Sequence, residues 1–153
     1  MMATAAKSYS FTSESGAGTV DVGRELAAIL TPPQLLLLEG DLGAGKTTLV
    51  KGIAAALNAA EPEEVTSPTF TLLHEFEGSW KGKKVRLLHL DVYRLEGERQ
   101  LETLGLEELE TEDALVLVEW GKKFPSLVKR ATGEIRIESI GGDKRKITVE
   151  LKQ

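Results

Sequence analysis

The sequence contains no cysteine among its 153 residues. Disulfides and thiolate metal sites are therefore excluded, and the chain suits a reducing compartment. No apolar run approaches the roughly 20 residues that a membrane-spanning helix needs, and residues 1–9 carry no apolar signal-peptide core. We expect a cytoplasmic protein without a membrane partner.

Aromatic residues and positive charge are scarce as well. Aromatics make up 5% of the chain and the net charge is −5, whereas a nucleic-acid-binding surface needs cations for the phosphates and often rings on which bases stack. A stand-alone RNA or DNA binder is therefore disfavoured. The 41% hydrophobic and 28% charged content is that of a globular protein, and the length predicts one domain over residues 1–153.

The most informative stretch runs from Gly40 to Thr48 and reads Gly-Asp-Leu-Gly-Ala-Gly-Lys-Thr-Thr. Its first eight residues fit the P-loop pattern G-x-x-x-x-G-K-[ST]. Four leucines at 35–38 precede it, as expected of a buried strand, and the apolar residues after it recur at helical spacing. The strand–loop–helix context predicts a P-loop NTPase domain. The alternative is a glycine-rich turn that binds nothing.

The residues of this loop suit a nucleotide phosphate and its metal. The glycines let backbone amides approach phosphate oxygens, and the N-terminus of the following helix adds partial positive charge. Lys46 can reach the β- and γ-phosphates, and the Thr47 hydroxyl can ligate Mg²⁺. The loop residues expected to bind the nucleotide are Asp41, Leu42, Gly43, Ala44, Gly45, Lys46, Thr47 and Thr48.

The whole chain predicts an α/β fold, with a mixed, mainly parallel sheet and helices on both faces. The first half of the chain predicts a strand at 8–13, a loop at 13–18, a helix capped by Thr19 and ended by Pro32, and then the P-loop strand and helix. Strands at 71–76 and 85–91 follow around a turn at 78–84, and short helices are expected within 93–113, broken near Gly105. The chain should end with a strand at 114–118, a connector from Lys122, and a terminal hairpin of strands at 134–139 and 145–151.

Two carboxylates follow apolar runs that read as central strands. Asp91 ends one run, which is the Walker B arrangement, and Glu119 ends another. At the carboxyl edge of the sheet both can face one metal and one attacking water, and the sequence leaves open which of them binds Mg²⁺ directly. The alternative for Asp91 is a surface carboxylate. The Trp120 ring can pack on the nucleotide, on a partner or in the core.

Two further features carry weaker signals. Thr69 lies between the P-loop helix and Asp91, where switch segments sense Mg²⁺ and the γ-phosphate, although ordinary turn chemistry explains the segment equally well. His74 and His89 lie inside strand patterns without metal-ligand spacing, and we interpret both as structural.

Three function classes fit a P-loop with two acids: a regulated ATPase, a small-molecule kinase and a GTPase switch. The GTPase lacks its Asn-Lys-x-Asp reader and the Asp-x-x-Gly after the Walker B strand. A kinase would want an arginine-bearing lid, and the arginines here are scattered. They are Arg24, Arg86, Arg94, Arg99, Arg130, Arg136 and Arg145. The regulated ATPase is favoured, and the kinase remains the alternative.

Four motifs in this order and spacing resemble the TsaE (YjeE) family, small bacterial ATPases of tRNA threonylcarbamoyladenosine biosynthesis. They are Gly40-Asp-Leu-Gly-Ala-Gly-Lys-Thr-Thr48, Ser67-Pro-Thr-Phe-Thr71, His89-Leu-Asp-Val-Tyr-Arg-Leu95 and Leu117-Val-Glu-Trp120. The resemblance covers the chain from about Thr19 onward. It implies a P-loop sheet flanked by helices.

The resemblance also implies site roles and partners. Gly43 to Thr48 would bind ATP, Thr47 and Glu119 would ligate Mg²⁺, and Asp91 would be the Walker B acid. Lys46, Asp91 and Glu119 are thus the expected catalytic residues, Asp91 being a further metal candidate, with Thr69 in the switch-like loop and Trp120 near the nucleotide. The implied partners are TsaD and TsaB, which modify adenosine 37 of tRNA. The acidic net charge suits a protein that meets tRNA only through such a complex.

Overall fold

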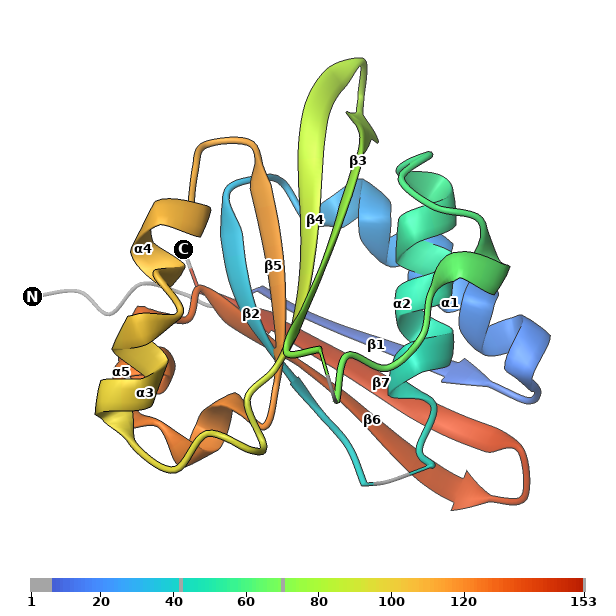
Figure 1. Cartoon of the computed structure of the whole chain (residues 1–153). Coiled ribbons are helices and arrows are strands. Elements are labelled where there is room, and N and C mark those ends of the chain that lie inside the picture. The colour runs from blue at the N-terminus through green and yellow to red at the C-terminus, as the bar shows by residue number, and fades with distance from the viewer. Residues whose placement is uncertain (1–6, 42, 70, 153) are drawn as a thin grey trace, which may run out of the picture.

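A single seven-stranded sheet forms the middle layer of the molecule (Figure 1). The computed structural model describes residues 7–41, 43–69 and 71–152. Helices α1 and α2 cover one face of the sheet, and the shorter α3, α4 and α5 lie over the other. The prediction of an α/β fold with helices on both faces is confirmed.

The elements follow one another along the chain with short connections. The strands are β1 (Lys7–Ser13), β2 (Gln34–Glu39), β3 (Leu73–Trp80), β4 (Lys83–Asp91), β5 (Ala114–Glu119), β6 (Gly133–Gly141) and β7 (Lys144–Leu151). The helices are α1 (Gly16–Ile29), α2 (Lys46–Ala56), α3 (Glu98–Thr103), α4 (Leu106–Leu109) and α5 (Pro125–Arg130), with 3-10 turns at Pro62–Glu64 and Gly121–Lys123. Within these described segments, no helix is both long and apolar enough to cross a membrane.

The strand order is β1-β7-β6-β2-β5-β4-β3. Neighbours are parallel from β6 through β2 and β5 to β4, whereas β1, β7 and β6 pair antiparallel, as do β4 and β3. The expected mixed sheet with a parallel middle is therefore present. The parallel pairing brings the carboxyl ends of β2, β5 and β4 to one edge of the sheet, beside the P-loop.

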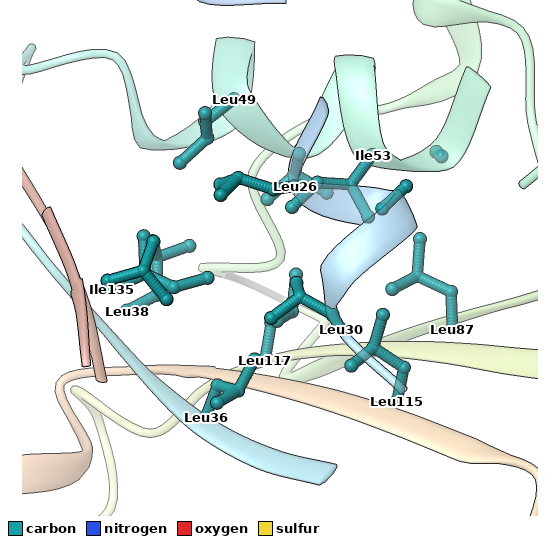
Figure 2. Close-up of a cluster of buried hydrophobic side chains, with 14 of the residues drawn as sticks. Leu26, Leu30, Leu36, Leu38, Leu49, Ile53, Leu87, Leu115, Leu117 and Ile135 are labelled. Carbon is teal, nitrogen blue, oxygen red and sulfur yellow. The ribbon is translucent and has the colours of Figure 1, made fainter. Parts of the chain in front are cut away.

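The central strands are apolar throughout because helices cover both of their faces. Along β2, Leu36 and Leu38 belong to the core under α1 and α2, whereas Leu35 and Leu37 belong to the core on the opposite face. Figure 2 shows the first of these cores, where side chains of β2 and β5 meet residues such as Leu26 and Ile53 of the helices. The alternation is the period of two that a pleated strand imposes.

The helix that follows the P-loop is fixed by a very close approach to α1. A Cβ atom added to Gly52 would lie 2.0 Å from the carbonyl oxygen of Val20, and one added to Gly23 would lie 2.3 Å from that of Leu49. Neither position has room for a side chain. The backbones of α1 and α2 therefore touch, and this contact sets where the P-loop helix begins relative to the sheet.

The start of α1 differs from the prediction. The helix begins at Gly16, where a loop was expected, and Ser15 rather than Thr19 is its N-cap, with Oγ accepting from Gly18 N at 3.0 Å. Thr19 lies inside the helix, 2.7 Å from Ser13 Oγ through its hydroxyl. The small residues at 16–18 look like a loop in sequence, but the serine cap satisfies a free amide of the first turn and offsets their low helix propensity.

The β3–β4 hairpin is longer than predicted, and its turn is shorter. The strands run to Trp80 and from Lys83, which leaves only Lys81 and Gly82 at positive φ of 48° and 82°. That is the two-residue turn whose twist matches a hairpin. Trp80 extends the strand because its Nε1 donates to Ala27 O at 2.8 Å, a contact with α1 that local sequence does not show. Helix α5 likewise replaces part of the expected connector.

Candidate functional site

The P-loop takes the backbone shape that its glycines permit. Gly43 and Gly45 have φ of 80° and 108°, values in the left-handed region that disfavours side chains. Gly45 is the N-cap of α2, and Lys46 and Thr47 form its first turn. The first amides of a helix have no partners within it, so this end is suited to an anion. Leu42 lies outside the described residues.

The far side of the P-loop rests on the C-terminal hairpin. Arg145 of β7 donates from Nε to Ala44 O at 2.7 Å and from Nη2 to Gly43 O at 3.4 Å. A Cβ added to Gly40 would lie 2.8 Å from the carbonyl oxygen of Ile137. Two of the scattered arginines therefore lie near the P-loop, because Arg145 supports the loop and Arg136 lines the cleft beside it.

The three predicted catalytic residues meet at the carboxyl edge of the sheet. Asp91 of β4 and Glu119 of β5 are register partners on adjacent parallel strands, 3% and 4% exposed. Lys46 Nζ, at the start of α2, lies 3.3 Å from Glu119 Oε1. The alternative that Asp91 is a surface carboxylate is thus wrong, since Asp91 is buried beside Glu119.

Asp91 is held from two directions. Its Oδ2 accepts from Thr69 Oγ1 at 3.1 Å, and its Oδ1 accepts from Tyr93 N at 2.9 Å. Thr69 in turn shares a hydrogen bond of 2.7 Å with Ser67. The segment before β3 is therefore linked to the Walker B position by a side-chain contact. The bond to Ser67 is ordinary turn chemistry, whereas the bond to Asp91 reaches the site, and the switch role of Thr69 stays a prediction.

Glu119 has a partner on each oxygen. Oε2 lies 2.6 Å from Nε2 of His89, a residue of β4 that is fully buried, and Oε1 faces Lys46. Burial raises the pKa of Glu119, but the hydrogen bond from His89 and the charge of Lys46 outweigh burial, so the pKa lies below its ordinary value. The sequence interpretation of His89 as structural missed this contact. Its only signal was that His89 and Asp91, two residues apart on a strand, share a face.

Trp120 lies at the surface beside the lysine. It is 41% exposed, so the core alternative for this residue is wrong. Its ring centroid is 5.2 Å from Lys46 Nζ and 4.9 Å from the ring of Tyr93. Its φ of 65° marks the sharp turn after β5. The ring therefore lies directly beside the P-loop lysine.

A cleft of about 680 Å³ opens beside the P-loop. It is bounded by the loop itself, by Trp120 and Lys122 after β5, and by Arg136 and Arg145 of the hairpin. Volumes of this order accommodate cofactor-sized ligands. No sequence motif indicates that the hairpin borders this cleft, because its nearness follows from β6 pairing with β2.

The oxygen ligands that Mg²⁺ prefers are present at this edge. Thr47 offers a hydroxyl, and Asp91 and Glu119 offer carboxylates. In the part of the chain that the structure describes, no three His, Cys, Asp or Glu side chains converge to form a complete cage. The donors therefore fit a Mg²⁺ that is bound by one or two carboxylates with phosphates and waters, and do not fit a structural metal.

The fold and this edge together define the class of protein. A P-loop that joins a central parallel strand to a helix, with acids at the ends of the next two parallel strands, β5 and β4, is the arrangement of the P-loop NTPase fold. The family model described as "Threonylcarbamoyl adenosine biosynthesis protein TsaE" matches residues 13–147. The chain belongs to the TsaE family.

Individual relatives agree with this membership. The chain is 44% identical over 112 residues to a tRNA threonylcarbamoyladenosine biosynthesis protein TsaE of Nostoc, covering 70% of this chain and 64% of that one. It is 36% identical over 139 residues to the protein of the same name from Aquifex aeolicus, covering 91% and 93%. A crystal structure of YdiB from Bacillus subtilis matches with a TM-score of 0.67 and 30% identity over 97% of this chain and 88% of that one.

Proposed function

We propose that this protein is a Mg²⁺-dependent ATPase that serves tRNA threonylcarbamoyladenosine biosynthesis by acting on a complex of TsaD and TsaB in the cytoplasm. The observation that carries the proposal is the meeting of Lys46, Asp91 and Glu119 beside a P-loop, with Thr69 bonded to Asp91. Family membership supports the pathway, since the relatives are named for it.

Each residue has a role that its position supports. Backbone amides from Gly43 to Thr48 and the Lys46 ammonium would bind the phosphates, and Trp120 would cover them. Thr47 and Glu119 would hold Mg²⁺, which neutralises charge on the phosphates when bound. Asp91 would orient the attacking water, directly or through Thr69. Phosphoryl transfer depends mainly on positioning and charge stabilisation, so these groups suffice for slow hydrolysis.

The direct test is ATP hydrolysis by the purified protein, alone and with TsaD and TsaB. We expect a slow rate alone and a higher rate with both partners, together with ATP-dependent capture of both partners in a pull-down. Equal rates with and without them would contradict the partner-coupled role. Phosphorylation of a small metabolite, with neither partner captured, would support the kinase alternative.

A variant separates catalysis from binding. Asp91→Ala should retain nucleotide binding and lose hydrolysis, because its carboxylate would orient the attacking water, whereas the P-loop amides and Lys46 would bind the phosphates. Asp143→Ala, at an exposed aspartate of the β6–β7 turn, is the matched control and should behave as wild type. Loss of the folded state in Asp91→Ala, seen by thermal unfolding, would make Asp91 structural.

A further inference from the structure

His89 is a buried polar residue that the proposed chemistry does not use. It lies in β4 between β3 and β5, opposite His74 on one side and Leu117 on the other, and it is 0% exposed. Its Nδ1 is buried and has no hydrogen-bond partner among the described residues. Among the residues that the structure describes, the ring's one hydrogen bond is therefore that of Nε2 with Glu119 Oε2 at 2.6 Å.

The direction of this hydrogen bond follows from the partners. An ionised carboxylate can only accept, so Nε2 is the donor. Glu119 is itself buried, and without His89 the oxygen Oε2 would lack the donor it has here. The shared strand face of His89 and Asp91 brings the ring to Glu119 from the neighbouring strand, in a position that packing on both sides fixes.

The second oxygen of Glu119 is in a different situation. Its partner is Lys46 Nζ, which is 3.3 Å away at the head of α2 and also lies over the exposed Trp120 ring. A lysine is a flexible point charge with rotatable donors, unlike a buried imidazole in a strand. Glu119 thus has one oxygen bound to a rigid group and one bound to a movable group.

We propose that His89 is a positioning residue that holds Glu119 Oε2 in place. When Lys46 turns to the nucleotide phosphates, only Oε1 then changes partner, from the Lys46 ammonium to Mg²⁺. This inference rests on the proposed ATP and Mg²⁺ site. Without the donor from His89, the carboxylate is free to rotate and Lys46 can hold both oxygens. The carboxylate then meets the metal in the wrong orientation.

The experiment measures Mg²⁺ affinity rather than turnover. ADP binding by calorimetry, in EDTA and across a Mg²⁺ titration, is compared for wild type, His89→Leu, His89→Gln and His74→Leu. Leucine removes the donor at similar volume, whereas glutamine retains an N–H near Nε2. His74, the register partner of His89, is the matched control. Removing a group that orients a metal ligand typically weakens metal affinity by about 10–100-fold.

We expect His89→Leu to lose about tenfold or more in Mg²⁺ affinity while its ADP affinity in EDTA is unchanged. His89→Gln and His74→Leu should resemble wild type. A structural role would instead weaken ADP binding in EDTA as well. Wild-type Mg²⁺ affinity in His89→Leu, or equal defects in the leucine and glutamine variants, would overturn the inference alone. A wild-type protein that binds no ADP, or binds it without Mg²⁺ dependence, would overturn the proposed function and this inference together.

A second measurement does not depend on the variants folding. The His89 Nε2 proton should be visible by NMR as a slowly exchanging signal both in the free protein and in the ADP and Mg²⁺ complex, because the contact with Oε2 persists. The Lys46 contact should be lost in the complex. Disappearance of the His89 proton signal on adding ADP and Mg²⁺ would overturn the proposal.

Discussion

Glu39 and Glu119 end neighbouring parallel strands at the same edge of the sheet, yet their surroundings differ. Leu38, the residue before Glu39, is the register partner of Glu119. Glu119 has partners on both oxygens, whereas Oε1 of Glu39 is buried with no partner in the described chain. Burial raises the pKa of Glu39 by more than the charge of Lys122 lowers it, while the pKa of Glu119 is lowered.

Position at a strand end does not by itself define a functional acid. Both side chains follow an apolar run and both lie beside the P-loop. The first difference is the face of the sheet, because Glu39 is one residue past the register partner of Glu119 and the two side chains therefore point to opposite faces. Their surroundings differ as well, since His89 and Lys46 favour the ionised form of Glu119, whereas burial disfavours that of Glu39. Glu119 is the register partner of Asp91 and lies 3.3 Å from Lys46 Nζ, so it fits the metal role, whereas the side chain of Glu39 lies on the other face of the sheet.

Substituting each acid in turn gives the largest expected effect. Glu119→Gln should lower the ATP hydrolysis rate by about 100-fold, the scale of losing one group that stabilises transition-state charge. Glu39→Gln should leave the rate unchanged. Steady-state hydrolysis at saturating Mg²⁺ measures both. A comparable loss in Glu39→Gln would mean that the two strand ends share the chemistry.

The same comparison shows how far the sequence could predict the site. The rule that an acid after an apolar run lies near the P-loop located Asp91 and Glu119, because a buried strand that ends in an acid can be recognised from the local sequence. The rule applies equally to Glu39, which follows four leucines. What separates Glu39 from Glu119 is the register of β2 against β5, which pairs Glu119 with Leu38 and so places Glu39 on the opposite face. This register, like the contacts of His89 and Lys122, depends on strand order and not on local pattern.

The contact of Arg145 with the P-loop could not be predicted from the sequence either, because the two segments lie far apart in the chain. It binds carbonyls of the P-loop about a hundred positions earlier in the chain, through β7 pairing with β6 and β6 with β2. Alternating hydrophobicity predicted the hairpin but not the strand beside which it adds. The parallel core, the P-loop and the hairpins were thus predictable from local periods, and the walls of the cleft were not.

Lys46 contacts Glu119 and Lys122 acts on Glu39, so substituting each lysine compares the two surroundings through their effect on ADP binding. Lys46→Met should weaken ADP binding by about tenfold or more, since hydrogen bonds to charged groups contribute about 1.5–3 kcal/mol. Lys122→Met should have a smaller effect, because Lys122 is half exposed and is 2.8 Å from Glu134. Calorimetric titration with ADP measures both. A larger loss in Lys122→Met would move the main phosphate contact from the P-loop to the turn after β5.

The raised pKa of Glu39 makes a prediction about stability and pH. Below its ordinary pKa of 4.5 the side chain is neutral in both states, and above its raised folded pKa the native state carries a partly buried charge. Glu39→Gln should therefore equal wild type near pH 4 and be more stable near pH 7, by a few tenths of a kcal/mol after solvent screening. Urea unfolding at both pH values measures the difference. A destabilised variant at pH 7 would mean that the charge of Glu39 makes a stabilising interaction in the folded protein.

The smallest effect is expected at Glu134, which acts on Glu39 from β6. Its carboxylate lies 2.8 Å from Lys122 and 2.9 Å from Arg136; burial raises its pKa, but these cations outweigh burial and lower it. Its contribution to stability is therefore present above pH 4.5 and is lost as the pH falls through the lowered pKa, so Glu134→Gln should cost about 0.2 kcal/mol at pH 7 and less in acid. Because the negative charge of Glu134 also helps to raise the pKa of Glu39, the variant should shift the NMR titration of Glu39 to lower pH. An unchanged titration would show that burial alone sets Glu39 apart from Glu119.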